Sequence, residues 1–253
     1  DPLYHQLSDE WNVLAAPPSW LTGHVLRRDC ILAPIPAADY AKHADELVLL
    51  PEIGIGSQGE VGSVLLFGAV PLDVMNTIAL PSDSATSVAL LKHLISKKGR
   101  AMEYIATGPD YESMMAIADG ALLIGDRALE AAKEFPEMVQ MDLGTAWMEE
   151  EDLPMIFGVF VARKDTPLPT LKAAHASLVR NLERFESDDR KRQAVIEWSM
   201  KKSGLSHERL DQYYGEVFNR LNQHHLSGLY RFLQHACGME SEPQFAWDQH
   251  SVV

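Results

Sequence analysis

The chain has 253 residues, 46% of them apolar and 23% charged, which is enough for one large domain or for two lobes of about 100 to 150 residues each. Its 22 basic and 36 acidic residues give a formal net charge of −14, which makes nucleic acid and anionic membrane surfaces poor partners. A small anion would need hydrogen-bond donors placed locally, because the long-range field of the protein repels it.

Taken in chain order, strand and helix patterns alternate and end in a helical tail, in which nothing looks catalytic. Short apolar or β-branched runs predict strands at residues 30–35, 46–50, 61–70, 75–80, 120–124 and 155–162. Helices are expected at residues 20–28, 88–95, 111–118 and 127–133. From residue 171 onward apolar residues recur at helical spacing, with Tyr214, Val217 and Leu221 on one face.

The two cysteines, Cys30 and Cys237, form no metal motif or redox pair, so a reducing compartment is the simpler interpretation. The sequence shows no signal-peptide pattern and no apolar run of about 18 residues, the length that would span a membrane. We therefore expect a cytoplasmic protein without membrane insertion. A processed leader ahead of Asp1 would change this expectation.

Residues 54–59 read G-I-G-S-Q-G and match the G-x-G-x-x-G pattern of dinucleotide-binding loops. Such a loop must open directly into a helix, whose free N–H groups hold the pyrophosphate. Residues 61–70 are instead apolar and β-branched, and Pro71 closes them, which indicates a second strand. We interpret residues 54–59 as a glycine-rich loop between two strands, where backbone can approach a ligand closely.

Other catalytic motifs are missing. The segment that begins at His207 lacks the last ligand of an H-E-x-x-H zinc site, and His224 and His225 are adjacent and so point apart on a helix. The sequence has neither a G-x-S-x-G nucleophile elbow nor a G-x-x-x-x-G-K-[ST] phosphate loop. We expect no metal site.

Two polar segments remain as candidate binding elements. Residues 81–87 place hydroxyls and free N–H groups at the start of a helix, which suits an anion. Residues 124–126, Ile-Gly-Asp, place an acid and a flexible turn at the end of an apolar strand, where α/β clefts bind ligands. Each also has a structural interpretation, a helix N-cap for the first and a turn for the second.

Eight collinear segments span most of the chain: residues 2–4, 34–40, 50–56, 62–67, 84–91, 123–129, 142–147 and 153–163. Together they resemble the chorismate dehydratases of the futalosine route to menaquinone. The resemblance implies an α/β protein with the two-lobed fold of type II periplasmic binding proteins and a helical C-terminal region. We expect residues 71–159 to form one lobe and residues 1–70 and 160–253 the other, with a ligand cleft between them.

The resemblance implies a lyase that converts chorismate to 3-[(1-carboxyvinyl)oxy]benzoate and water without a metal or organic cofactor. Loss of the ring hydroxyl and a neighbouring ring proton makes the ring aromatic, so the enzyme must chiefly hold a dianion, orient it and assist proton movement. Two alternatives stay open. A sister enzyme that forms dihydroxynaphthoate shares the fold, and so does a non-catalytic solute-binding protein for a small carboxylate. The sequence does not specify an oligomeric state.

The resemblance also marks site residues. Ser63 matches the family's cleft serine and is the candidate catalytic residue. The candidate substrate-binding residues lie beside it, in the polar helix start and in the second-lobe turn: Gly62, Ser84, Thr86, Ser87, Ile124, Gly125 and Asp126.

This chain departs from the family pattern at three places. Ala85 replaces the usual arginine, and Asp83 adds a negative charge nearby. The family's asparagine, three positions before the proline of residues 2–4, would precede residue 1. The first two departures weaken the expected binding of a substrate carboxylate.

Overall fold

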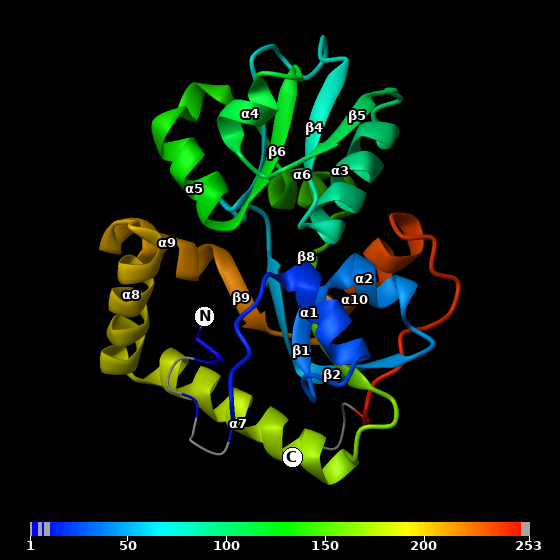
Figure 1. Ribbon diagram of the computed structural model, residues 1–253, viewed down its shortest axis with the longest axis vertical. Helices are drawn as coiled ribbons and strands as arrows, with labels where there is room; N and C mark the ends of the chain where they lie inside the picture. Colours follow the sequence, from blue (N-terminus) through cyan, green and yellow to red (C-terminus); the bar gives the residue numbers. More distant parts are fainter. Residues whose placement is uncertain (1, 5–6, 8–10, 249–253) are drawn as a thin grey trace.

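The computed structural model describes residues 2–4, 7 and 11–248, which form two lobes that each contain one β-sheet (Figure 1). The sheet of the lower lobe has the order β1-β8-β2-β9, and the sheet of the upper lobe has the order β5-β4-β6-β3-β7. The lower strands are β1 (Ala33–Pro36), β2 (Leu47–Ser57), β8 (Met155–Arg163) and β9 (Val217–Arg220). The upper strands are β3 (Val64–Gly68), β4 (Thr77–Pro81), β5 (Glu103–Thr107), β6 (Gly120–Ile124) and β7 (Val139–Asp142).

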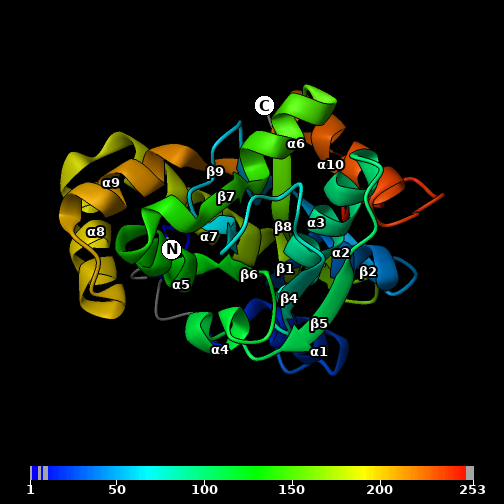
Figure 2. The same ribbon diagram turned by 90° about the horizontal axis from the view of Figure 1, so that it is seen from above.

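Helices cover both sheets and extend the lower lobe. The upper lobe carries α3 (Ala85–Lys97), α4 (Tyr111–Met115), α5 (Gly125–Glu134), the 3-10 turn Pro136–Met138 and α6 (Leu143–Glu151). The lower lobe carries α1 (Pro18–Leu26), α2 (Ala37–Lys42), α7 (Leu168–Ser187), α8 (Asp189–Ser203), α9 (His207–Glu216) and α10 (Gln223–His235). Seen from above, α8 and α9 lie on one side of the molecule and α2, α3 and α10 on the other (Figure 2).

The apolar runs form the buried strands, as expected. Every residue of β3 is buried, which explains its continuous apolar sequence, because both faces of that strand are covered. β3 pairs antiparallel with β6, and β4 lies parallel to β5 and β6. In the lower sheet β8 pairs antiparallel with both β1 and β2. Within the described residues, no helix combines the length and apolarity that a membrane span requires.

The positions at which the chain changes lobe differ from the expected boundaries. β3 was assigned to the lobe of residues 1–70, but it pairs with β6 and β7 in the upper sheet. Residues 155–159 were assigned to the other lobe, but they belong to β8 in the lower sheet. The chain therefore crosses in the short segments before β3 and before β8. The apolar runs at residues 61–70 and 155–162 could not predict these crossing points, because an apolar run is compatible with a buried strand in either sheet.

The glycine-rich loop is also shorter than expected. β2 continues to Ser57, so Gly54 and Gly56 lie inside a strand. A Cβ at Gly54 would lie 2.9 Å from Leu221, and one at Gly56 would lie 2.6 Å from Phe218, so close packing against β9 and the residue after it explains these two glycines. The turn that leads to β3 contains Gly59 and Gly62, whose φ angles of 96° and 65° favour glycine.

Short elements were missed. The expected helical face that included Val217 and Leu221 is wrong, because α9 ends at Glu216 and residues 217–220 pair with β2 as strand β9. The sequence patterns also predicted no helix or strand at α2, β5, β7 or α6. These segments are short or rich in polar residues, so their periodicity is weak and tertiary pairing decides their conformation.

A cluster of side chains around the buried carboxylate of Glu151 joins the lobes beside α10. Glu151 ends α6 of the upper lobe, and its side chain is only 4% exposed. Arg231 of α10, in the lower lobe, donates to Glu151 Oε2 at 3.1 Å. Glu151 Oε1 lies 3.5 Å from His93 and 3.8 Å from both Lys97 and His235. Because an unpaired buried carboxylate is unfavourable, these contacts favour the arrangement of lobes that brings α10 to α6.

We expect Arg231→Met to lower the free energy of unfolding by about 1 to 3 kcal/mol, because it leaves a buried carboxylate oxygen without its charged donor. The matched control is Arg27→Met, which removes an exposed ion pair with Asp29 and should change stability by less than about 1 kcal/mol. Urea unfolding of the two variants measures the difference. Equal losses would show that the cluster does not hold the lobes.

Candidate functional site

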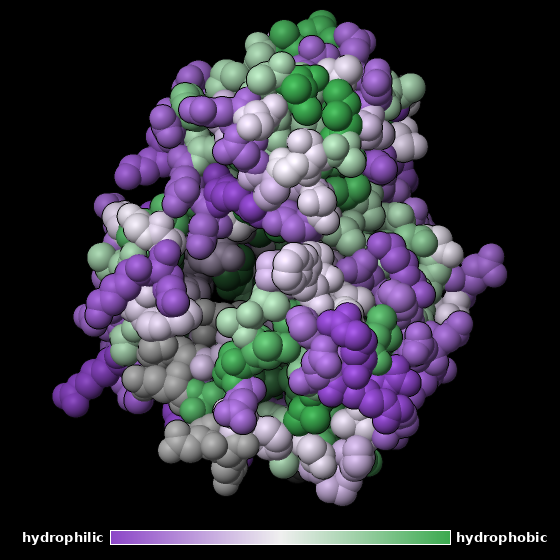
Figure 3. Space-filling model, in the orientation of Figure 1, coloured by the Kyte–Doolittle hydropathy of each residue, from purple (hydrophilic) through white to green (hydrophobic). Residues whose placement is uncertain are grey.

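A cavity of about 1370 Å³ lies between the lobes, and the space-filling view shows a hollow there (Figure 3). It is larger than the roughly 300 to 1,000 Å³ of most small-molecule sites. Residues of both sheets line it, together with the start of α3, the start of α5 and one residue of α9. One end is polar, and an apolar arm extends from it into the lower lobe.

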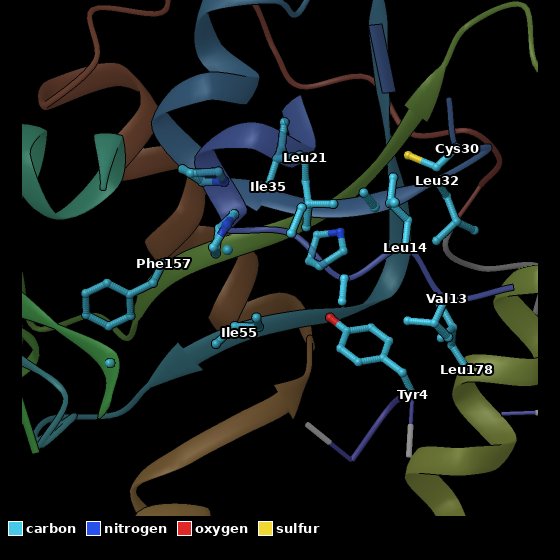
Figure 4. Close-up of a pocket in the computed structure, with 18 of the residues that line it drawn as sticks. Tyr4, Val13, Leu14, Leu21, Cys30, Leu32, Ile35, Ile55, Phe157 and Leu178 are labelled. Atoms are coloured by element: carbon cyan, nitrogen blue, oxygen red, sulfur yellow. The ribbon is translucent and has the colours of Figure 1, made fainter. Parts of the chain in front are cut away.

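The apolar arm lies between the segment that precedes α1, strand β1 and helix α7 (Figure 4). Val13 and Leu178 lie at one end of the view and Phe157 at the other, with Ile35 and Ile55 between them. All five side chains line the cavity. The arm offers apolar contact area, whereas the hydrogen-bonding groups gather at the polar end.

Four buried hydroxyl groups define the polar end. Ser63, Ser84, Thr86 and Ser87 all line the cavity, and none is more than 6% exposed. Ser63 comes directly before β3, and the other three come from the first turn of α3 and its N-cap. The structure therefore brings together the serine before β3 and the polar helix start that the sequence singled out separately.

The start of α3 presents backbone donors to this end. The first N–H groups of an α-helix have no partner inside the helix, and the helix dipole adds partial positive charge there. In α3 the N-cap is Ser84, whose side chain makes no capping bond, and whose carbonyl accepts from Val88 N at 3.1 Å. The N–H groups of Ala85, Thr86 and Ser87 precede that first bond. This geometry suits a carboxylate.

Thr86 also links the lobes. Its Oγ1 accepts a hydrogen bond from the backbone N–H of Ala38, in α2 of the lower lobe, at 3.1 Å. Both residues are buried. The start of α3 is therefore fixed against the lower lobe, and the Thr86 hydroxyl keeps its own proton available to a ligand.

The turn at residues 124–126 of the upper lobe is hydrogen-bonded to the backbone of Ser63. Gly125 N donates to the carbonyl of Ser63 at 2.7 Å, and its φ of 61° favours glycine. Ile124 and Gly125 line the cavity, whereas Gly62 and Asp126 are not among the lining residues. Gly62 is needed for close packing instead, because a Cβ there would overlap the Arg209–Glu216 ion pair of α9.

Asp142 fixes the turn that carries Ser63. Its carboxylate caps α6 by accepting from Thr145 N at 2.9 Å, and it also accepts from Val61 N at 3.1 Å and Gly62 N at 2.8 Å. A Cβ at Gly144 would lie 2.3 Å from the carbonyl of Gly59, so α6 begins in contact with the turn. An Asp directly before a helical segment predicts an N-cap, but it does not predict that the same carboxylate also binds the N–H groups of Val61 and Gly62.

A tyrosine from the helical tail was missed. Tyr213 of α9 lines the cavity, as Ser63 does. Burial raises the pKa of Tyr213, its interaction with the Ser63 side chain lowers it, and the neighbouring Tyr214 and the charges of Asp126 and Glu216 raise it further. The helical pattern of the tail gave no signal for Tyr213, because a tyrosine at helical spacing is ordinary.

The site offers little positive charge. Among the described residues that line the cavity the charged ones are Asp29 and Asp83, with no Lys, Arg or His. Arg127 of α5 donates to Asp83 Oδ2 at 2.5 Å, which offsets the charge that Asp83 adds, while Asp83 Oδ1 is buried without a hydrogen-bond partner. With Ala85 where the family usually has arginine, an anion must rely on N–H groups and hydroxyls. In the described part of the chain, no group of three or more His, Cys, Asp and Glu side chains could hold a metal ion.

We expect Asp142→Ala to destabilise the protein by more than the roughly 0.5 to 2 kcal/mol of an ordinary N-cap loss, because it also removes the partner of two N–H groups in the turn. The matched control is Asp110→Ala, since Asp110 caps α4 through Ser113 N alone. Denaturant unfolding compares the two variants. A loss at Asp142 no larger than at Asp110 would contradict its role in fixing the turn.

Comparisons with known proteins show which family the sequence matches. The sequence model of a family described as "Menaquinone biosynthesis" matches residues 1–237. A chorismate dehydratase from Thermus thermophilus is 35% identical over an alignment of 190 residues, and the match covers 66% of this chain and 68% of that protein.

Solved structures share the fold at low sequence identity. Protein AF1704 from Archaeoglobus fulgidus has a TM-score of 0.64 and 20% identity, and the match covers 89% of this chain and 86% of that one. The periplasmic aliphatic sulphonate binding protein SsuA from Escherichia coli has a TM-score of 0.61 and 14% identity, covering 89% and 74%. These likenesses confirm the two-lobed fold of periplasmic binding proteins, with a helical C-terminal region.

Proposed function

The chain belongs to this menaquinone-biosynthesis family, and we propose that it is a chorismate dehydratase, which converts chorismate to 3-[(1-carboxyvinyl)oxy]benzoate and water. The curated relative supports the assignment over the sister enzyme that forms dihydroxynaphthoate. The observation in this chain that best supports the proposal is the polar end of the cavity, which is lined by the buried hydroxyl of Ser63 and by three buried hydroxyls at the start of α3.

The reaction suits a site without strong bases. A ring C–H bond and a ring C–O bond break, the hydrogen and the hydroxyl leave together as water, and the ring becomes aromatic. The product is therefore favoured, and the protein must hold the dianion, orient it and place a proton. A carboxylate of the substrate is the proton acceptor in this scheme, because the described lining contains no histidine and one of its two carboxylates, Asp83, is already paired with Arg127.

The residues take separate roles in the proposal. The N–H groups at the start of α3, with the hydroxyls of Ser84, Thr86 and Ser87, bind a carboxylate. Ser63 lies beside the reacting ring carbons and stabilises charge on the departing oxygen. Ile124 and Gly125 contact the ring. Gly62 and Asp126 support the site from outside the cavity, through packing and charge, rather than by contacting substrate.

The cytoplasmic location expected from the sequence remains part of the proposal. Cys30 and Cys237 are free thiols, which is compatible with a reducing compartment. The fold alone also suits a solute-binding protein for a small carboxylate. The two functions differ in one observable, turnover.

Incubation of the protein with chorismate, followed in the ultraviolet, tests the proposal. We expect an aromatic product to accumulate catalytically. Tight binding of chorismate without product would indicate a binding protein. Release of product from a cyclic futalosine derivative, with none from chorismate, would indicate the sister enzyme.

Replacement of Ser63 tests its proposed role. We expect Ser63→Ala to lower kcat by roughly a hundredfold to a thousandfold, the usual loss on removing one well-placed transition-state donor, with KM little changed. Steady-state kinetics with chorismate measures both constants. Turnover at the parent rate would contradict the assignment of Ser63.

Thr86→Val should raise KM for chorismate, because it removes a hydroxyl that binds substrate and leaves Ala38 N buried without its acceptor. Thr86→Ser is the matched control, since it keeps the hydroxyl and removes only a methyl group. We expect the serine variant to keep KM close to the parent value. The same KM for valine and serine variants would show that this hydroxyl contributes nothing to binding.

A further inference from the structure

The carboxylate of Asp83 lies at the polar end of the cavity with only one of its oxygens paired. Asp83 lines the cavity and comes one residue before Ser84, the N-cap of α3. Its Oδ2 accepts from Arg127 of α5 at 2.5 Å, while its Oδ1 is buried and accepts no hydrogen bond from the described residues. A buried acceptor without a partner is unfavourable, so a contact must keep this carboxylate from turning to nearby donors.

The nearby donors are the N–H groups at the start of α3. A negative charge beside a helix N-terminus is favoured by these free N–H groups and by the helix dipole. The Ser84 side chain makes no capping bond, so it does not occupy them. An aspartate next to the N-cap is therefore a competitor inside the protein for the donors that a ligand carboxylate would use.

Arg127 is held where it can keep the Asp83 carboxylate aside. It lies in the first turn of α5, whose first residue, Gly125, donates to the carbonyl of Ser63 at 2.7 Å. Leu129, two residues after Arg127, is buried, so α5 is anchored in the upper lobe. Because α3 belongs to the same lobe, the ion pair between Arg127 and Asp83 does not depend on how the lobes meet.

We propose that Arg127 is a positioning residue for the dehydration proposed above: by pairing with Asp83, it keeps that carboxylate off the N–H groups at the start of α3, which stay available to a carboxylate of the substrate. The inference rests on the proposed function, since it takes the start of α3 as the place where the substrate carboxylate binds. It explains how a chain with an acid beside this helix start can bind an anion there.

Direct contact between Arg127 and the substrate is the competing explanation. Arg127 is not among the described residues that line the cavity, and its side chain is 42% exposed. The two explanations differ in what happens when Asp83 is removed as well. A residue that only holds Asp83 aside becomes unnecessary, whereas a residue that binds the substrate does not.

A second ion pair supplies a matched control. Asp29 also lines the cavity, and Arg27 contacts its Oδ2 at 3.1 Å. Both residues follow the end of α1, so Asp29 is not next to a helix N-terminus. Arg127→Met and Arg27→Met each remove one arginine from a cavity-lining aspartate and change the net charge equally. They differ in whether the released carboxylate lies beside the start of α3.

The test compares KM and kcat for chorismate in the parent, Arg127→Met, Asp83→Ala, the Asp83→Ala/Arg127→Met double variant and Arg27→Met. We expect Arg127→Met to raise KM by at least about tenfold with kcat within about twofold, because the released anion opposes binding of substrate and transition state alike. The double variant should return KM to within about twofold of the Asp83→Ala value. Arg27→Met should keep the parent KM.

Two kinetic outcomes would overturn the inference. One is a parent KM in Arg127→Met. The other is a raised KM that persists in the double variant, which would show that Arg127 itself contacts the substrate. Thermal unfolding of each variant separates these results from misfolding, and an Arg127→Met variant that unfolds early is replaced by Arg127→Gln.

A crystal structure of ligand-free Arg127→Met tests the inference without chorismate. We expect a carboxylate oxygen of Asp83 within about 2.7 to 3.2 Å of a backbone nitrogen at the start of α3. An Asp83 side chain that makes no contact with these nitrogens would contradict the inference. If this contact forms but the parent does not turn over chorismate, the proposed function fails and the pairing role of Arg127 stands.

Discussion

The proposed function imposes one electrostatic constraint on the structure, which is that the cavity has to hold an anion without a cationic side chain among its described lining residues. Donors must then come from backbone N–H groups and hydroxyls, and these are effective only when they are fixed and desolvated. The start of α3 supplies backbone N–H groups. The hydroxyls come from Ser63, Ser84, Thr86 and Ser87. Since these groups come from segments far apart in the chain, the rest of the fold serves to hold them together.

The contacts between the lobes follow from that constraint. The Thr86 hydroxyl of the upper lobe accepts a hydrogen bond from Ala38 N of the lower lobe. Glu151 of the upper lobe contacts Arg231 and His235, which both belong to α10 of the lower lobe. Asp142 fixes the turn before β3 by binding two of its N–H groups. Each contact lies close to a crossing of the chain or to the start of α3. In the structure, these contacts hold the groups of the proposed site on one cavity.

Local patterns in the sequence predicted those parts whose conformation is decided locally. The apolar run of β6 and the polar residues at the start of α3 depend on neighbours in the chain, and both elements form as expected. The apolar run of β3 predicted a strand but not its sheet, since pairing partners are set by tertiary contacts. The resemblance marked Gly62 as a substrate-binding residue, and in the structure its φ of 65° favours glycine, while a Cβ there would meet the ends of the Arg209 and Glu216 side chains of α9.

The site was predictable to the same extent. Ser63 and the polar start of α3 could be named because they fall in segments with a family resemblance, whereas Tyr213 lies in a helix whose pattern is ordinary. Neither spacing nor composition relates Tyr213 to Ser63; only the packing of α9 does.

The most direct test of the account is a crystal structure of the Ser63→Ala variant with chorismate bound. The account predicts a carboxylate of the ligand within about 2.7 to 3.1 Å of backbone nitrogens at the start of α3, with the ring between residue 63 and Gly125. A ligand bound only in the apolar arm, with no contact to α3, would contradict it.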